Sequence, residues 1–265
     1  MRILSIFPDE FPEHWASDWG EDEYGLWMGF TYKGVKQFFR WIEPGTFLMG
    51  SPTNEPERVK YEIQHAVIIS QGFWLADCTV TQALWQAAMG TNPSEFKGDN
   101  YPVEQVSWHD AQSFIDKLNG LKPELKLCLS TEAQWEYACR AGTRTPFSFG
   151  DNIDSSQANF DGNYPYNNSR KSEYRQQTVA VKSLPPNPWG LHEMHGNVWE
   201  WCQDWYGAYP TETATDPQGA DSGDSRILRG GSWINGGRLC RSSSRLYSAP
   251  DIANRNVGFR LARGD

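Results

Sequence analysis

Apolar side chains recur at helical spacing in three short segments of the chain. Each segment opens with a hydroxyl residue that can accept a hydrogen bond from the first turn, followed by an acid or amide that can reach back to the cap. Gly90 and Gly142 follow two of the apolar stripes, as expected at helix C-termini. The pattern therefore predicts helices over 79–90, 107–118 and 131–142.

Strand patterns are shorter than the helical ones and depend on loose alternation of apolar and polar residues. The two central patterns, separated by only two residues, are expected to pair as a hairpin. Residues 152–190 show little periodicity and many Asn, Ser, Tyr, Pro and Gly, so we expect a long loop there, functional or pinned by something bound. The predicted strands cover 38–42, 46–49, 66–69, 72–75, 227–229 and 257–261.

Length and composition indicate one large, loop-rich domain. The chain has 265 residues, among them 13 Trp and 24 Gly, which supply bulky core rings and turns. We assign residues 38–265 to the domain and residues 1–37, rich in acids and aromatics, to an N-terminal extension packed on it. No internal repeat is present.

Charge and cysteine content exclude several classes of partner. The net charge of −9 argues against nucleic acid and against an anionic membrane surface. No apolar run has the roughly 18 residues that would span a bilayer, and the N-terminus lacks the apolar stretch of a signal peptide.

The five cysteines form no C-x-x-C pair and no zinc spacing, so most are expected to be buried and apolar. We expect a cytoplasmic protein.

Seven sequence blocks occur in the order found in one family. They lie at 40–51 (RWIEPGTFLMGS), 102–108 (PVEQVSW), 130–138 (STEAQWEYA), 186–191 (PNPWGL), 196–201 (GNVWEW), 229–233 (RGGSW) and 258–260 (GFR). Together they resemble the formylglycine-generating enzyme (sulfatase-modifying factor) family. The resemblance implies an α+β, C-type lectin fold, loop-rich with few short helices and strands, in which the chain ends pair as adjacent strands.

The same resemblance implies that the family's oxidase chemistry is missing. Oxidases of the family use two cysteines, five residues apart, that bind copper; their positions fall here on Gly237 and Ser242, with Cys240 between them. Neither Gly nor Ser supplies a thiolate, so we expect no enzyme activity and no redox cofactor. The alternative is a divergent metal-dependent oxidase, or an enzyme similar to the family's iron-dependent sulfoxide synthases. His192 and His195 form only an H-x-x-H step and are interpreted as polar loop residues.

Two oxygen-rich sets resemble structural calcium sites of the family. Calcium accepts six to eight oxygen ligands, including backbone carbonyls. We expect one or two calcium ions to pin residues 152–200; the alternative is that these side chains only bond loop amides. The first set comprises Glu193, Gly196, Val198 and Glu200, and the second comprises Asn159, Phe160, Glu173 and Arg175.

The segment 234–256 has an unusual composition. It contains no Lys, Glu, Gln, Met or Trp, although these types supply 57 of the 265 residues. Every residue in it can be encoded by a codon ending in C, the set reached when both adenines of the Asn codon AAC are randomised. The composition therefore indicates mutation directed at adenines.

This segment resembles the diversified part of variable proteins of diversity-generating retroelements, which often share this fold and end in Gly-Phe-Arg. The resemblance implies a C-terminal surface that binds an unknown protein or small molecule, with the arginines as scaffold. Exposed Ile, Leu and Tyr suit such a surface, because Tyr gives rigid contact area and Ser, Gly and Asn adapt. The alternative is a drifted family member of fixed specificity. The positions expected to vary are Ile234, Asn235, Gly236, Gly237, Leu239, Ser244, Leu246, Tyr247, Ser248, Ile252, Asn254 and Asn256.

Overall fold

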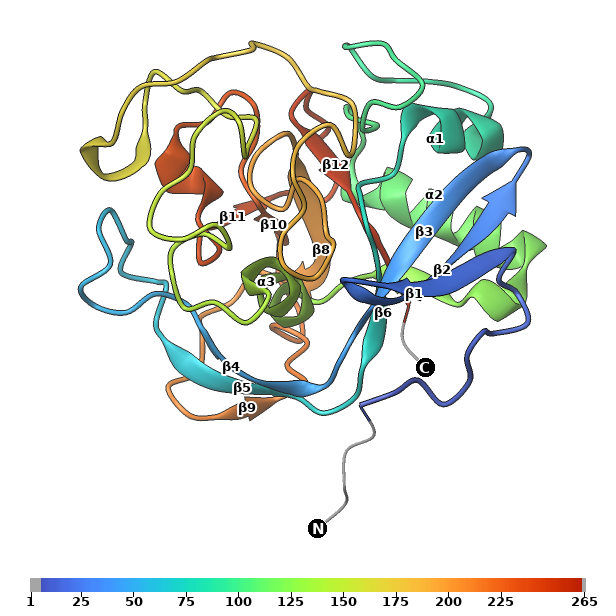
Figure 1. The fold of residues 1–265 in the computed structure, drawn as a ribbon, viewed down its shortest axis with the longest axis horizontal. Helices are drawn as coiled ribbons and strands as arrows, with labels where there is room; N and C mark the ends of the chain where they lie inside the picture. Colours follow the sequence, from blue (N-terminus) through green and yellow to red (C-terminus); the bar gives the residue numbers. More distant parts are fainter. Residues whose placement is uncertain (1–5, 264–265) are drawn as a thin grey trace.

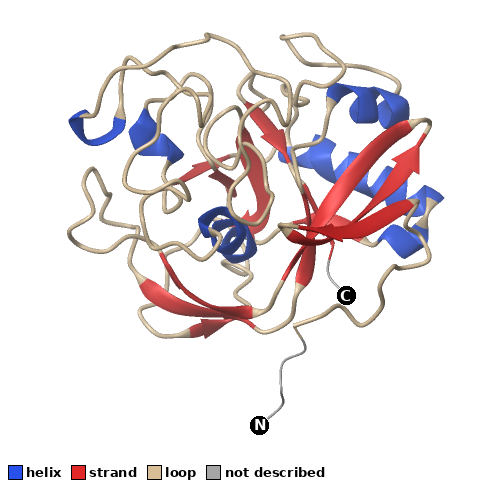
Figure 2. Ribbon diagram, viewed as in Figure 1, coloured by secondary structure: helices blue, strands red, loops and turns tan. Residues whose placement is uncertain are grey.

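The computed structural model describes residues 6–263, in which loops occupy much of the chain between short helices and strands (Figure 2). The α-helices are α1 (Gln82–Met89), α2 (Trp108–Leu121) and α3 (Glu132–Arg140). Single 3-10 turns lie at η1 (Pro123–Leu125), η2 (Tyr166–Asn168) and η3 (Gly237–Cys240). Within the described residues, no helix has the length and apolar character to cross a membrane.

All three predicted helices are present, and their caps explain where they begin. Ser107 and Thr131 each accept a hydrogen bond from the third helical amide, and the residue at that position bonds back to the cap amide. Helix α1 differs from the prediction, because its cap is Thr81 rather than Thr79 and no side chain returns a bond. The reciprocal cap predicted for this helix was therefore wrong.

The largest sheet has six strands in the order β1-β2-β3-β6-β13-β7. Helix α1 packs beside β2 and β3, and α2 lies against α1 and β7 (Figure 1). The boundary that we placed after residue 37 falls inside β3, since β1 and β2 extend the sheet from its edge. The strands are β1 (Asp18–Asp22), β2 (Gly25–Tyr32), β3 (Val35–Ile42), β6 (Phe73–Ala76), β7 (Leu127–Leu129) and β13 (Leu261–Arg263).

Two smaller sheets complete the fold. One has the order β11-β10-β8-β12, with β12 parallel to β8 and the other pairs antiparallel; the second has the order β4-β5-β9. The strands of the first are β8 (Trp199–Trp205), β10 (Arg226–Arg229), β11 (Arg245–Ser248) and β12 (Val257–Phe259). Those of the second are β4 (Gly45–Met49), β5 (His65–Ile69) and β9 (Ala214–Thr215).

Three details of strand pairing differ from the prediction. Strands β5 and β6 form no hairpin, because β5 pairs with β4 and β6 pairs with β3. The single strand expected over 257–261 divides at Arg260 into β12 and β13, which belong to different sheets. The chain ends do not pair as adjacent strands, since β6 lies between β3 and β13; they meet instead through the ion pair of Glu13 with Arg263.

The core is built largely from aromatic rings. Trp74, Trp135, Trp199 and Trp201 are all fully buried. The indole of Trp135 donates to Glu200, and that of Trp201 donates to the carbonyl of Val106, so these two rings are buried with their polar edges satisfied, whereas Nε1 of Trp74 is buried without a partner. This rigid frame carries the segment 234–256 on its surface.

Candidate functional site

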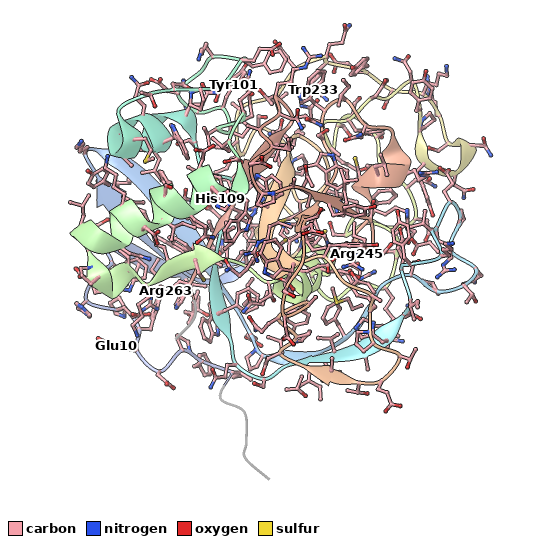
Figure 3. The ribbon with its side chains drawn as sticks, turned by 180° about the vertical axis from the view of Figure 1, so that it is seen from behind. Glu10, Tyr101, His109, Trp233, Arg245 and Arg263 are labelled. Atoms are coloured by element: carbon pink, nitrogen blue, oxygen red, sulfur yellow. The ribbon has the colours of Figure 1, made fainter. Side chains whose placement is uncertain are left out.

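The segment 234–256 runs from the end of the Arg229–Trp233 block to β12 and contains both η3 and β11. Figure 3 shows the molecule from behind and labels Trp233, which immediately precedes the segment, and Arg245, the first residue of β11. Four large apolar side chains of the segment are exposed: Ile234 (41%), Leu246 (40%), Tyr247 (49%) and Ile252 (43%). The predicted exposure of Ile, Leu and Tyr is therefore found at these four positions, where the side chains contribute little to the core.

Strand β11 gives this surface a regular element that the sequence did not reveal. It pairs antiparallel with β10, with Leu246 opposite Leu228 and Tyr247 opposite Ile227. The ring of Tyr247 packs on that of Tyr206, with ring centroids 4.1 Å apart. Beside Ser248, the guanidinium of Arg226 lies between the rings of Trp108 and Trp205 at 3.9 and 3.4 Å. Tyr206 and Arg226 thus border the exposed surface without belonging to the segment.

Two positions expected to vary are buried, and their assignment to the surface was wrong. Ser244 is 2% exposed, and its carbonyl accepts from Arg229 at 2.5 Å. Gly237 is also buried, and a Cβ added there would lie 2.9 Å from the backbone nitrogen of Tyr166. Substitution at these two positions would disturb packing rather than change a binding surface.

The remaining predicted positions differ in exposure. Asn254 is exposed, whereas Asn235, Gly236, Leu239, Ser248 and Asn256 are partly buried. Asn235 and Asn256 both bond the hydroxyl of Ser232, at 2.5 and 3.1 Å. Leu239 packs against the main core. The structure thus separates an exposed group from a group that shares contacts with the scaffold.

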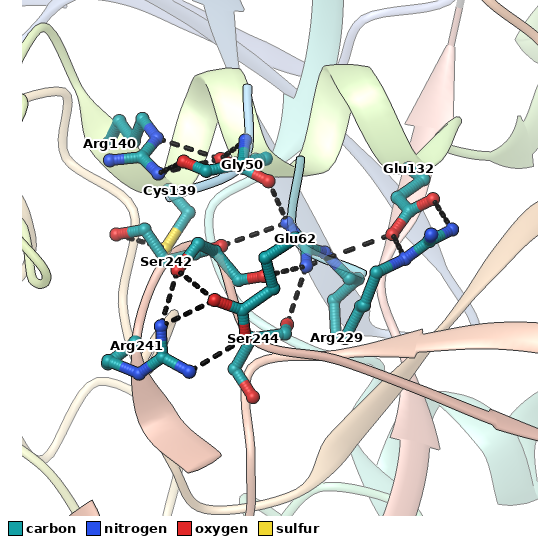
Figure 4. A network of polar contacts seen from close by, with 12 residues as sticks. Gly50, Glu62, Glu132, Cys139, Arg140, Arg229, Arg241, Ser242 and Ser244 are labelled. Carbon is teal, nitrogen blue, oxygen red and sulfur yellow. Dashed lines mark hydrogen bonds and ion pairs between the residues drawn. The ribbon is translucent and has the colours of Figure 1, made fainter. Parts of the chain in front are cut away.

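Three buried arginines, Arg229, Arg241 and Arg245, hold the backbone of the segment on its buried side (Figure 4). Arg241 bonds Glu55 at 2.5 Å and Glu62 at 2.7 and 2.8 Å. Arg245 bonds both carboxylate oxygens of Glu132, at 2.6 and 2.8 Å. Each charge is paired in a buried environment, where loss of one partner is strongly destabilising.

Arg229 on β10 joins the segment to helix α3. Its guanidinium pairs with Glu136 and donates to the carbonyls of Ser242, Ser243 and Ser244 at 2.9, 3.1 and 2.5 Å. The backbone immediately before β11 is therefore held by side-chain bonds. The scaffold role predicted for the arginines of the segment agrees with the buried positions of Arg241 and Arg245, but not with Arg238 and Arg255, which are exposed.

Gly237 and Ser242, the positions to which the resemblance assigns the family's two cysteines, offer no thiol. The hydroxyl of Ser242 is buried and lies 3.7 Å from the sulfur of Cys139. Cys240, between the two positions, is also buried, and burial raises the pKa of its thiol to about 12. At neutral pH this thiol is protonated, whereas nucleophilic and metal-binding cysteines act as thiolates.

The two histidines of the H-x-x-H step serve different loops. Nε2 of His195 accepts from the amide of Ser148 at 3.1 Å, so Nδ1 carries the proton that bonds the carbonyl of Cys240 at 2.8 Å. Burial lowers the pKa of His195 to about 4, which keeps the ring neutral. Nδ1 of His192 lies 3.0 Å from the carbonyl of Leu184. Across residues 6–263, no three His, Cys, Asp or Glu side chains are grouped as metal ligands.

The first predicted calcium set does not fit a cation well. Arg260 donates to both carboxylate oxygens of Glu200, at 2.8 and 3.0 Å, and so occupies the place of a positive charge. Glu193 accepts from the amides of Lys182 and Leu184, and burial raises its pKa to about 7. Gly196 and Val198 lie buried on the same stretch. The side-chain oxygens of this set are already engaged.

The second set fits calcium better. Oδ1 of Asn159 is buried without a hydrogen-bond partner, although its amide nitrogen bonds Gln177 and Asn197. Phe160 follows on the same buried stretch, while Glu173 is exposed at 62% of its side chain and pairs with Arg175 at 3.1 Å. Asn159 Oδ1 is thus a buried oxygen without a partner, which a calcium ion would satisfy, whereas the Glu173 carboxylate is engaged with Arg175.

Comparison with known proteins agrees with this architecture. Residues 35–264 match the sulfatase-modifying factor enzyme 1-like domain. The chain belongs to this family. The formylglycine-generating enzyme of Mus musculus is 33% identical over 215 residues, covering 78% of this chain and 55% of that protein. The inactive C-alpha-formylglycine-generating enzyme 2 of Bos taurus is 30% identical over 199 residues, covering 72% and 59%. The chain thus spans little more than half the length of these relatives.

Among solved structures, Treponema denticola variable protein 1 superposes with a TM-score of 0.77 at 28% identity, covering 89% of this chain and 98% of that one. PvdO from Pseudomonas aeruginosa shares the fold, with a TM-score of 0.69 at 23% identity over 94% of this chain and 99% of that one. Both resemblances indicated by the sequence, to the sulfatase-modifying factor family and to variable proteins, are confirmed.

Proposed function

We propose that this member of the family is a ligand-binding protein whose C-terminal segment is diversified, on a scaffold that no longer performs the family's oxidation. The proposal rests on the contrast between exposed apolar side chains and buried arginines within 234–256. Ile234, Leu246, Tyr247 and Ile252 face solvent, while Arg241 and Arg245 beneath them are locked in buried ion pairs. Surface residues can therefore change without loss of the frame.

The chemistry of the exposed residues supports binding. Isolated apolar side chains on a surface are ordinary, but several on one short segment indicate an interaction site. Tyr247 offers a large rigid ring, already ordered by Tyr206, so that little side-chain entropy remains to be lost on binding. The likeness to a variable protein over nearly the whole of both chains supports the same function.

The loss of oxidase activity is part of this proposal. Gly237 and Ser242 stand where the family's oxidases have cysteines, and the neighbouring Cys240 is buried with a raised thiol pKa. If the chain nevertheless were a divergent metal-dependent oxidase, purified protein loaded with copper or iron would consume oxygen with a thiol substrate. Sustained oxygen uptake abolished by Cys240→Ser would contradict the proposal.

Binding is tested by mapping where ligands attach. Binders would be selected from two displayed libraries, one of linear peptides and one of small folded domains, and measured against single variants. We expect most independent binders to lose at least about tenfold in affinity, or about 1.4 kcal/mol, on Tyr247→Ala or Leu246→Ala. Trp19→Ala is the matched control, since Trp19 is 51% exposed on β1 in a different sheet. Binders that map mainly elsewhere would contradict the proposal.

A further inference from the structure

We infer that β11 binds its partner as an added strand: the ligand is an extended polypeptide segment that extends the β11-β10-β8-β12 sheet by one strand. The inference rests on the proposed function and specifies the class of ligand. It follows from the position of β11 in the sheet, the free hydrogen-bonding groups of its outer edge and the side chains that flank that edge.

β11 is an edge strand that pairs with β10 alone. The four residues Arg245–Ser248 are opposite Arg229–Arg226 in an antiparallel register without a bulge. In such a pair, alternate residues direct their backbone N–H and C=O groups to opposite sides of the strand. One alternate pair of β11 therefore directs its backbone N–H and C=O groups away from β10, and this pair is either Arg245 and Tyr247 or Leu246 and Ser248.

The outer edge has no partner within residues 6–263. The backbone of β11 makes no backbone hydrogen bond beyond its ladder with β10, whereas the flanking chain does. The amide of Ser244 bonds the carbonyl of Arg241, and the carbonyl of Pro250 accepts from His109. Among the described residues, the outer backbone groups of β11 are thus free. A row of unpaired groups on an edge strand is a template for another strand.

Side chains flank this edge on both faces of the sheet. Leu246 and Tyr247 are consecutive and both exposed, and consecutive strand residues point to opposite faces. A strand added beside β11 would place its own side chains next to both. Cross-strand pairs of aromatic and aliphatic residues stabilise such neighbours, so the preferred ligand is an extended peptide with apolar residues on both faces.

The edge at β1 provides a contrast within the same molecule. Of the acids on β1, Glu21 and Asp22 are exposed, and exposed charges on an edge strand discourage further pairing. β11 has one charged residue, Arg245, which is buried and neutralised by Glu132. No exposed charge on β11 therefore opposes an incoming strand.

The edge is also held in its binding conformation before a ligand arrives. Arg229 bonds the three carbonyls that precede β11, and Arg245 anchors its first residue. A preordered strand loses little conformational entropy when it pairs, which favours affinity. Variation at Leu246 and Tyr247 would then change which peptide is chosen, while the backbone bonds remain the same.

The test measures backbone protection directly, using the unmodified protein. Twelve-residue linear peptides selected as binders would be added to isotope-labelled protein, and amide hydrogen exchange in β11 followed by NMR. We expect two alternate amides, of Arg245 and Tyr247 or of Leu246 and Ser248, to exchange at least about tenfold more slowly with peptide bound. N-methylation along the peptide should weaken binding at every second position, because alternate peptide amides face β11.

The outcomes separate this inference from the proposed function. Peptides that depend on Tyr247 but leave the β11 amides unprotected, with no period-two effect of N-methylation, would overturn the added strand and leave surface binding intact. A dimer in sedimentation whose β11 amides are protected without peptide would also overturn it, since the occupant would be a second copy of the chain. Binding unaffected by Tyr247→Ala would contradict the proposed function as well.

Discussion

Arg241 and Glu62 form a buried two-point ion pair across 179 residues of sequence, with nitrogen–oxygen distances of 2.7 and 2.8 Å. The pair joins the C-terminal segment to the loop that follows β4. Because both partners are almost fully buried, the contact is insulated from solvent. It keeps the backbone beneath the exposed surface in place whatever side chains that surface carries.

Removal of Arg241 should strongly destabilise the folded protein. Arg241→Ala leaves Glu55 and Glu62 buried without a counter-charge, and we expect a loss of about 3–5 kcal/mol in the free energy of unfolding. Urea denaturation measures the change. Arg238→Ala is the control, since Arg238 is exposed in the same turn and its replacement should stay within about 0.5 kcal/mol. Equal effects of the two variants would show that the buried network does not support the fold.

The exposed side chains should behave in the opposite way. Tyr247→Ala and Leu246→Ala are each expected to lower stability by less than about 1 kcal/mol, because neither side chain fills the core. Leu228→Ala, directly opposite Leu246 in the register but 2% exposed, should lose about 2–5 kcal/mol. Thermal and urea melts of the three variants provide the comparison. Severe unfolding of either surface variant would place those side chains in the core.

Glu193 gives a pH dependence with a definite sign. Burial raises the pKa of its carboxyl from 4.5 to about 7 in the folded protein, so the folded state binds more protons than the unfolded state between these values. Its contribution to stability is therefore present below pH 4.5 and falls as pH rises toward 7. In Glu193→Gln this slope should disappear, so that the stability of the variant relative to the parent increases from pH 5 to pH 8. A difference that stays constant with pH would contradict the assignment.

Calcium binding is predicted at the set around Asn159 rather than at the set around Glu200. Added calcium should raise the melting temperature of protein prepared with a chelator, because an ion bound only to the folded state stabilises it. Asn159→Asp should retain this response and Asn159→Leu should lose it. Isothermal titration calorimetry reports the number of ions. A protein whose melting temperature and titration are unaffected by calcium would exclude both predicted sets.

The sequence predicted elements that depend on local chemistry and failed where partners are distant. Ser107 and Thr131 cap their helices with residues three positions away, so the signal is complete within one turn. Strand β6 instead follows β5 by a few residues and pairs with β3 and β13, which no local pattern reveals. The predicted hairpin was wrong for that reason.

Prediction of the candidate site from the sequence also failed where the contacting residues are distant in the chain. The resemblance of the segment to variable proteins predicted the exposure of Leu246 and Tyr247, but nothing near Ser244 indicates that Arg229 would bury its carbonyl. Gly237 resembles any loop glycine until the close backbone of Tyr166 is known. The partners of Arg241 lie near the start of the domain, so its scaffold role followed from the family resemblance and not from spacing.

If the segment is diversified, substitutions should reach the exposed face of 234–256 and spare the buried frame. Sequencing the 3′ end of the gene and its flank across many isolates of the source measures this. We expect substitutions concentrated at Ile234, Leu246, Tyr247, Ile252 and Asn254, with Gly237, Ser244 and the buried arginines unchanged, and a nearby repeat that differs only at adenines. A segment constant among isolates, or one varying equally at exposed and buried positions without such a repeat, would contradict diversification of this surface.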